Sequence, residues 1–303
     1  MRLPLFADAR RALRAFLGRN HYFTRKTAGK TGRQKEILHV LSEEGRIQLE
    51  ITGQMYLIVL PLVFFAALMD AIAGGGGLIS LPAYMLAGLP PVMASGSNKF
   101  SAMFGSLMAT FRFGRSGRLP WTPALLAAAG ALPGSYLGAE VLKHVSDEWL
   151  RTFLLVALPA AGLLLVFGRI GSGEEKPLTR SALMLCPVVG LVVGFYDGFF
   201  GPGTGTILIL LFTGLMKMDM VSASGAAKLV NLASNVAAMT SLLKDGKVLL
   251  ELAVPAMVLS AVGGYLGAKL ALVVGAKLIK RVMLCVFALI LLKLLLDYFG
   301  IHF

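Results

Sequence analysis

Two lysines occupy unusual positions, because both lie inside apolar stretches. Lys99 and Lys228 each follow an Ala-Ser-Gly sequence by three residues. A charged side chain within a membrane-spanning helix is costly and normally faces a cavity or a partner. The alternative, a lysine that extends from a helix end to the membrane interface, stays open.

Polar neighbours favour the cavity. In a helix, Lys228 shares one face with Ser224, Asn231 and Asn235, which are spaced by four, three and four residues. Lys99 has a sparser stripe with Ser95 and Ser106, and Asn98 lies beside it. Such stripes predict a polar cavity with positive charge, which suits an anion.

Glycine-rich stretches precede both lysines, at residues 74–77 and 201–205. A helix that stops and restarts there leaves free backbone N–H groups and a positive dipole end, which favour an anion. We expect Gly75, Gly76, Gly203 and Thr204 to supply such donors. Close helix packing is the alternative. A nucleotide-binding loop fits poorly, because GPGTG follows no strand and lacks a Lys-Ser/Thr ending.

Asp70 and Asp197 lie just before the two glycine stretches. Each could pair with a lysine, carry a coupling proton or cap a broken helix. Spacing does not separate these roles, so both aspartates are predicted site residues of coupling or structural function.

The composition places these residues in a polytopic all-α membrane protein. Of the 303 residues, 56% are apolar and 15% charged, and the mean hydropathy is +0.76. Two shorter apolar pieces, 78–89 and 207–216, fall below the ~20 residues that cross a bilayer and are predicted to be re-entrant or broken. Eight full spans are predicted at residues 57–73, 94–113, 123–142, 150–167, 183–200, 221–243, 249–270 and 282–298.

The spans form two similar sets. Residues 94–100 (ASGSNKF) match 223–229 (ASGAAKL), and residues 134–141 (GSYLGAEV) match 263–270 (GGYLGAKL), both at an offset of 129. Internal duplication is typical of secondary transporters, whose substrate lies between the repeats. The predicted organisation is a basic arm at 1–54, a first repeat at 55–170, a loop at 171–180 and a second repeat at 181–303.

The relative orientation of the repeats depends on the short pieces. If these turn back, each repeat has four spans, and the basic loop residues at 112–118, 169–180 and 244–247 share the side of the arm. We prefer this scheme by the positive-inside rule. If the pieces cross fully, each repeat has five segments and the copies are inverted.

The arm holds 11 Lys+Arg against 5 Asp+Glu, which predicts a cytoplasmic N-terminus. Residues 1–18 suit a helix on an anionic membrane surface. The arm lacks the pattern of a nucleic-acid reader, and no cleavable signal peptide is expected. The two cysteines and four histidines form no cluster, so we expect no metal, no cofactor and no enzymatic activity.

The stretches MDAIAGGGGLISLPAYMLAGLPP with ASGSNK, and GFYDGFFGPGTG with ASGAAKLVNLASN, resemble the sulfite exporter TauE/SafE family of bacterial inner-membrane proteins. The similarity is closest to its branch of probable membrane transporters and covers about residues 56–298. Ser97, where relatives often have threonine, is a conservative departure. The motif positions are Asp70, residues 74–77, Asn98 and Lys99 in the first copy, and Asp197, Gly201, Pro202, Gly203, Gly205, Lys228, Asn231 and Asn235 in the second.

The resemblance implies export of a small sulfur-containing anion, sulfite or an organosulfonate, across the inner membrane. We expect the lysines, asparagines and glycine breaks to bind it, with alternating access between the repeats. The coupling ion, proton or sodium, and a homo-oligomeric state are left open. Two alternatives are a non-transporting scaffold or anion sensor that uses the arm, and a cation transporter that uses Asp70 and Asp197.

Overall fold

The structure is a computed structural model that describes residues 51–150, 152–153, 156–157, 159–160 and 179–273, together with 40–41 and 47–48. The chain divides into two compact units, Met1–Ile51 and Thr52–Phe303. The surface helix predicted at residues 1–18 and the span predicted at 282–298 lie outside the described residues. So does most of the span predicted at 150–167.

The first unit contains two short strands that the sequence did not predict. β1 (Val40–Leu41) pairs with β2 (Ile47–Gln48) in antiparallel register, with Val40 opposite Gln48 and Leu41 opposite Ile47. Two residues per strand are too few for an independently stable sheet. The all-α prediction therefore holds for the described part of the second unit and not for these four residues.

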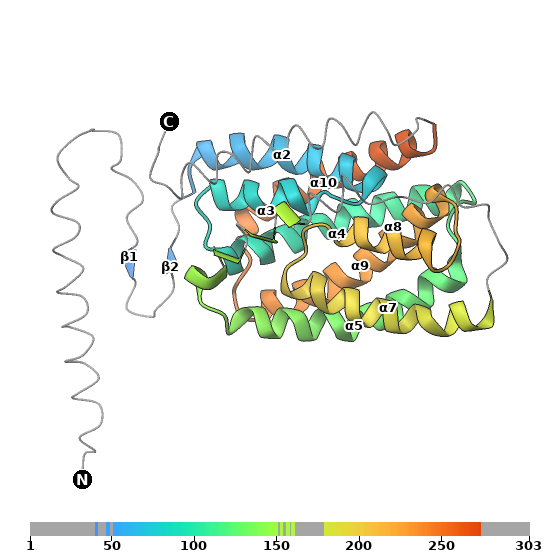
Figure 1. Cartoon of the computed structure of the whole chain (residues 1–303). Coiled ribbons are helices and arrows are strands. Elements are labelled where there is room, and N and C mark those ends of the chain that lie inside the picture. The colour runs from blue at the N-terminus through green and yellow to red at the C-terminus, as the bar shows by residue number, and fades with distance from the viewer. Residues whose placement is uncertain are drawn as a thin grey trace, which may run out of the picture. The chain divides into compact units, whose positions relative to one another are not determined.

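The described part of the second unit is built from helices whose long members run side by side (Figure 1). Short helical pieces also occur at residues 152–153, 156–157 and 159–160. The labelled helices are α2 (Gly53–Ala73), α3 (Gly77–Leu86), α4 (Pro91–Arg115), α5 (Trp121–Lys143), α7 (Arg180–Phe199), α8 (Thr204–Gly214), α9 (Met220–Lys244) and α10 (Leu250–Ala271).

Four of these helices, α2, α5, α7 and α10, are long and apolar enough to cross a membrane. α3 and α8 are shorter apolar helices of 10 and 11 residues, about half the length that a bilayer requires. α4 and α9 have 25 residues each but carry the polar stripes. Their serines and asparagines are buried, as are Lys99 and Lys228, so the polar faces of these two helices lie in the interior of the bundle.

Contacts between helices show the direction in which each one runs. Gly96 of α4 lies against Lys247, just before α10, and Gly105 lies against Ser260 further along α10. α4 and α10 are therefore parallel. By the same kind of contact α2 is parallel to α10, and α7 is parallel to α5.

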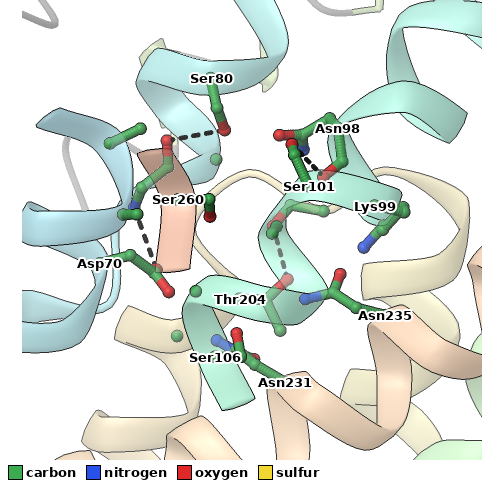
Figure 2. Close-up of a pocket in the computed structure, with 18 of the residues that line it drawn as sticks. Asp70, Ser80, Asn98, Lys99, Ser101, Ser106, Thr204, Asn231, Asn235 and Ser260 are labelled. Carbon is green, nitrogen blue, oxygen red and sulfur yellow. Dashed lines mark hydrogen bonds between the residues drawn. The ribbon is translucent and has the colours of Figure 1, made fainter. Parts of the chain in front are cut away.

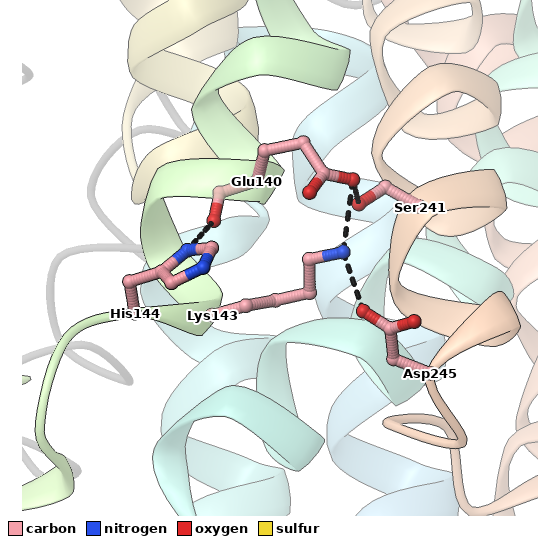
Figure 3. A network of polar contacts seen from close by, with 5 residues as sticks. All are labelled: Glu140, Lys143, His144, Ser241 and Asp245. Atoms are coloured by element: carbon pink, nitrogen blue, oxygen red, sulfur yellow. Dashed lines mark hydrogen bonds and ion pairs between the residues drawn. The ribbon is translucent and has the colours of Figure 1, made fainter.

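The C-terminal ends of α5 and α9 also meet. Lys143 of α5 bridges Glu140 of the same helix, at 2.8 Å, and Asp245, which directly follows α9 (Figure 3). Ser241 of α9 donates a hydrogen bond to Glu140, at 2.8 Å. Nearer the middle, Ser135 of α5 donates to the carbonyl oxygen of Ser234 in α9. α5 and α9 are therefore parallel.

These directions contradict the preferred four-span scheme. That scheme needs α4 antiparallel to α10 and α5 antiparallel to α9, and both pairs are parallel. Gly225, near the start of α9, lies against Phe113 near the end of α4 and Arg118 just beyond it, so α4 and α9 are antiparallel. The directions match the inverted alternative, and the basic residues at 112–118 lie at the opposite end of the bundle from Lys244 and Lys247. Charge counting failed because the basic residues divide between both ends.

Small residues allow the close packing of these helices. A Cβ atom at Gly105 would lie 2.5 Å from the Ser260 hydroxyl, and Gly264 lies against Gly105. The tyrosines of the repeated G-x-Y-L-G-A sequences face outward, since Tyr136 is 36% and Tyr265 40% exposed. The glycines of these sequences pack closely against neighbouring helices, Gly134 and Gly138 against α7 and Gly263 and Gly267 against α2, while the tyrosines lie outside the interior.

Candidate functional site

Both predicted helix breaks are present. α2 ends at Ala73, its C-cap Gly74 has a φ of 79° in the left-handed region that favours glycine, and α3 begins at Gly77. α7 ends at Phe199, and Gly201 and Gly203, with φ of 95° and 84°, lead into α8. The chain reverses at both places inside the bundle.

The two breaks touch each other. The Gly74 carbonyl oxygen accepts a hydrogen bond from the Thr206 N–H, at 3.0 Å. The Thr206 hydroxyl donates to the Ala73 carbonyl oxygen, at 3.1 Å. Gly77 lies against Pro202. The N-terminal ends of α3 and α8 therefore meet, and both positive helix dipole ends lie at one place in the interior.

Two ion pairs flank this meeting point, and each joins the two halves of the sequence. The Lys228 ammonium lies 2.6 Å from Asp70 Oδ2, and the Lys99 ammonium lies 2.8 Å from Asp197 Oδ2. The Gly76 N–H also donates to Asp70, at 3.1 Å, and the Ser234 hydroxyl donates to Asp197. Two of the roles left open for the aspartates are therefore visible: both aspartates pair with a lysine, and Asp70 also binds a free N–H group at the start of α3.

A polar cavity lies between these groups (Figure 2). Its volume is about 50 Å³. Because one water needs roughly 10–15 Å³ of such space, the cavity has room for about four water-sized groups. Eight predicted site residues line it: Asp70, Gly76, Asn98, Lys99, Asp197, Thr204, Asn231 and Asn235. Gly75 and Gly203 do not line it, and Lys228 lies behind Asp70.

Several of the lining side chains have unused hydrogen-bonding capacity. Asn98 is 8% and Asn231 6% exposed, and their Oδ1 atoms have no partner among the described residues. The Ser260 hydroxyl, 1% exposed, also lacks one there. Buried polar groups are normally satisfied, so three unsatisfied groups around one cavity indicate a place for a polar ligand or water.

Several serines at the cavity were not predicted as site residues from the sequence. Ser260 of α10, Ser80 of α3 and Ser101 of α4 line the cavity, and Ser234 of α9 bonds to Asp197. Serine is common in interior helix positions, where it bonds to its own backbone, so the residue type gives little signal. Ser234 directly precedes Asn235, and this adjacency was the one available hint.

The charge of the site differs from the expectation. The two lysines predicted a positively charged cavity, but each lysine is already paired with an aspartate. With all four groups ionised, their charges cancel. The positive character of the cavity then comes from the helix ends and from hydrogen-bond donors.

Comparisons with known proteins show the family of this chain. The family model described as "Sulfite exporter TauE/SafE" matches residues 59–294. The chain belongs to the TauE/SafE family. This TauE/SafE protein is accordingly a membrane transporter by family.

Named relatives support the same assignment. The chain is 34% identical over 240 residues to a "Probable membrane transporter protein" of Haemophilus influenzae, covering 79% of this chain and 94% of the relative. It is 34% identical over 248 residues to the "Probable membrane transporter protein YfcA" of Escherichia coli K12, covering 80% and 92%. A Bacillus subtilis relative, "Probable membrane transporter protein YdhB", is 23% identical over 70% of this chain and 89% of its own length.

These names describe transporters and not enzymes. No solved structure matches the chain.

Proposed function

We propose that this TauE/SafE protein is a secondary transporter that exports a small sulfur-containing oxyanion, sulfite or an organosulfonate. The observation that carries the proposal is the cavity at which the N-terminal ends of α3 and α8, Lys99 and the asparagines come together. Helix N-terminal ends and amide donors are the groups that bind oxyanions in proteins.

The size of the cavity supports a small substrate. Space for about four water-sized groups is close to the size of an ion such as sulfite or methanesulfonate. The polar lining agrees, because Lys99, Asn98, Asn231 and Asn235 can all donate hydrogen bonds.

The ion pairs support alternating access. Asp70 and Lys99 belong to the first predicted repeat, and Lys228 and Asp197 to the second, so both pairs cross between the repeats. Rocking of one repeat against the other would strain or exchange these contacts around a substrate held between them. The cation alternative gains no support here, because both carboxylates are engaged by lysines.

We further propose that the protein lies in the bacterial inner membrane with a cytoplasmic N-terminus. The 11 basic residues of the arm adjoin the start of α2 in the sequence. Basic residues lie at both ends of the bundle, so the loops do not set the orientation. The excess of lysine and arginine in the arm then places the N-terminus on the cytoplasmic side under the positive-inside rule.

Flux in proteoliposomes tests the function. Lys99→Gln removes the positive charge that lines the cavity, so we expect a loss of sulfite or methanesulfonate flux of at least about tenfold, the effect of one charged hydrogen bond. Lys247→Gln is the matched control, because Lys247 is exposed beyond α9 and outside the cavity lining. Equal flux in both variants would contradict the proposal, provided that both are folded and inserted.

A further inference from the structure

The inference concerns what must accompany the anion, and it rests on the proposed function. Among the cavity lining, the ionised groups are Asp70 of α2, Asp197 of α7 and Lys99 of α4. Lys228 of α9 lies behind Asp70 at 2.6 Å. From the other packed helices, α8 and α10 present threonine, glycine or serine to the cavity, and the buried phenol of Tyr84 in α3 donates to Ser101.

These four charges sum to zero, so a monovalent anion would leave the site with one uncompensated negative charge. The interior has low polarity, and an unbalanced buried charge is strongly unfavourable there. Hydrogen bonds from the asparagines and the helix ends would offset only part of this cost. To keep the site neutral, one positive charge must therefore enter with the anion, or one of the two carboxylates must lose its negative charge.

We propose that the anion binds together with one proton, and that Asp70 accepts the proton. A proton from water forms an O–H bond with a carboxylate oxygen of Asp70, and no covalent bond breaks in the protein. The ion pair between Asp70 and Lys228 is lost, and the anion becomes the new counter-charge of Lys228. One positive and one negative charge enter together, so the site stays neutral.

The two aspartates differ in a way that selects Asp70. The side chain of Asp70 is 22% exposed, on the cavity side, whereas that of Asp197 is 7% exposed. Each aspartate has two partners, Lys99 and Ser234 for Asp197 and Lys228 and the Gly76 N–H for Asp70, so the exposed fraction is what distinguishes them. Lys228 is 0% exposed and has no other carboxylate partner among the described residues. Neutralising Asp70 therefore frees a buried charge beside the cavity, which the anion compensates.

Coupling of this kind makes transport of a monovalent anion electroneutral. The membrane potential then exerts no force on the step, while a pH gradient does. Net export proceeds only while the outward anion gradient exceeds the opposing proton gradient. In proteoliposomes, an acidic exterior should drive methanesulfonate uptake, and clamping the potential should leave that uptake unchanged.

Direct proton counting tests the proposal on the full chain in detergent. Methanesulfonate is the probe, because it keeps one negative charge and takes up no proton itself. It is titrated into weakly buffered protein while a pH indicator records proton uptake and thermal shift records binding. The parent should take up about one proton per bound anion, with affinity falling about tenfold per unit rise in pH while Asp70 is ionised.

Two variants locate the proton. Asp70→Asn should bind methanesulfonate without proton uptake and with an affinity that does not change with pH. Asp245→Asn is the matched control, because Asp245 is also paired with a lysine, Lys143, but lies outside the cavity. It should keep the proton uptake of the parent. Should Asp70→Asn fail to fold, the proton count and pH dependence of the parent still decide the coupling.

The outcomes separate the two proposals. If neither methanesulfonate nor sulfite binds the parent, the proposed function itself fails. If methanesulfonate binds with no proton uptake, the function stands and proton coupling is overturned. If Asp70→Asn still takes up one proton per anion, the assignment to Asp70 is wrong.

Discussion

Lys228 pairs with Asp70 and does not itself line the cavity. Replacement by methionine would leave the Asp70 carboxylate without its counter-charge. We expect Lys228→Met to lower the free energy of unfolding by roughly 2–3 kcal/mol, less than for fully buried pairs because Asp70 borders the cavity. The double variant Lys228→Met/Asp70→Asn should recover most of the loss, since no unpaired charge remains. Thermal unfolding in detergent measures both.

Lys143→Met is the control for that comparison. Its partner Asp245 is 49% exposed, so this replacement should cost less than about 1 kcal/mol. A Lys228→Met protein as stable as the parent would show that the pair with Asp70 contributes nothing to the fold.

At the residue scale, the sequence predicts which residue types meet but not their partners. Helical spacing placed Asn231 and Asn235 on one face with Lys228, and both asparagines line the cavity. The pairing of Lys228 with Asp70 spans 158 positions and depends on how α9 packs near α2. No local sequence pattern predicts a contact between residues so far apart in the chain. The neutral charge balance of the site could therefore be seen only after folding.

At the scale of elements, the contact between the two helix breaks is the feature most sensitive to substitution. A Cβ atom at Gly205 would lie 2.5 Å from the Gly74 carbonyl oxygen, so backbone must move to admit it. We expect Gly205→Ala to lower the free energy of unfolding by about 1–3 kcal/mol and to widen the gap between α3 and α8. Thermal unfolding and the affinity for methanesulfonate measure the two effects.

Gly214→Ala provides the control in the same helix. A Cβ atom at Gly214 meets nothing within 4 Å. Alanine also favours helix, so this variant should be neutral or stabilised by up to about 1 kcal/mol. If Gly205→Ala and Gly214→Ala lower the free energy of unfolding equally, the contact between the two breaks is not the cause of the loss.

The elements themselves were largely predictable, because apolar length and glycine runs are local properties. Both short helices and both breaks lie where the sequence placed them, with ends shifted by a few residues. The direction of the helices was not predictable by charge. The arginines at the end of α4 and the lysines at the end of α9 looked equivalent in sequence, yet they lie at opposite ends of the bundle. Packing of small residues between helices fixes the directions instead.

At the scale of the whole molecule, the two units are expected to have separate roles. The cavity and all its lining residues belong to the unit Thr52–Phe303. The arm lies outside the residues that the family model matches, 59–294. Transport should therefore not need the arm once the protein is inserted. The scaffold or sensor alternative requires the opposite.

Deleting the arm genetically would confuse this test, because its basic residues also influence insertion. A protease site placed after Ile51 allows the arm to be cut off after reconstitution, when the orientation is already set. We expect methanesulfonate flux to stay within about twofold of the uncut protein, which is below 1 kcal/mol in transition-state free energy. Vesicles containing the same protein without protease are the control. Loss of most flux on cleavage would assign the arm a part in transport, and an unchanged rate would confine transport to the helical unit.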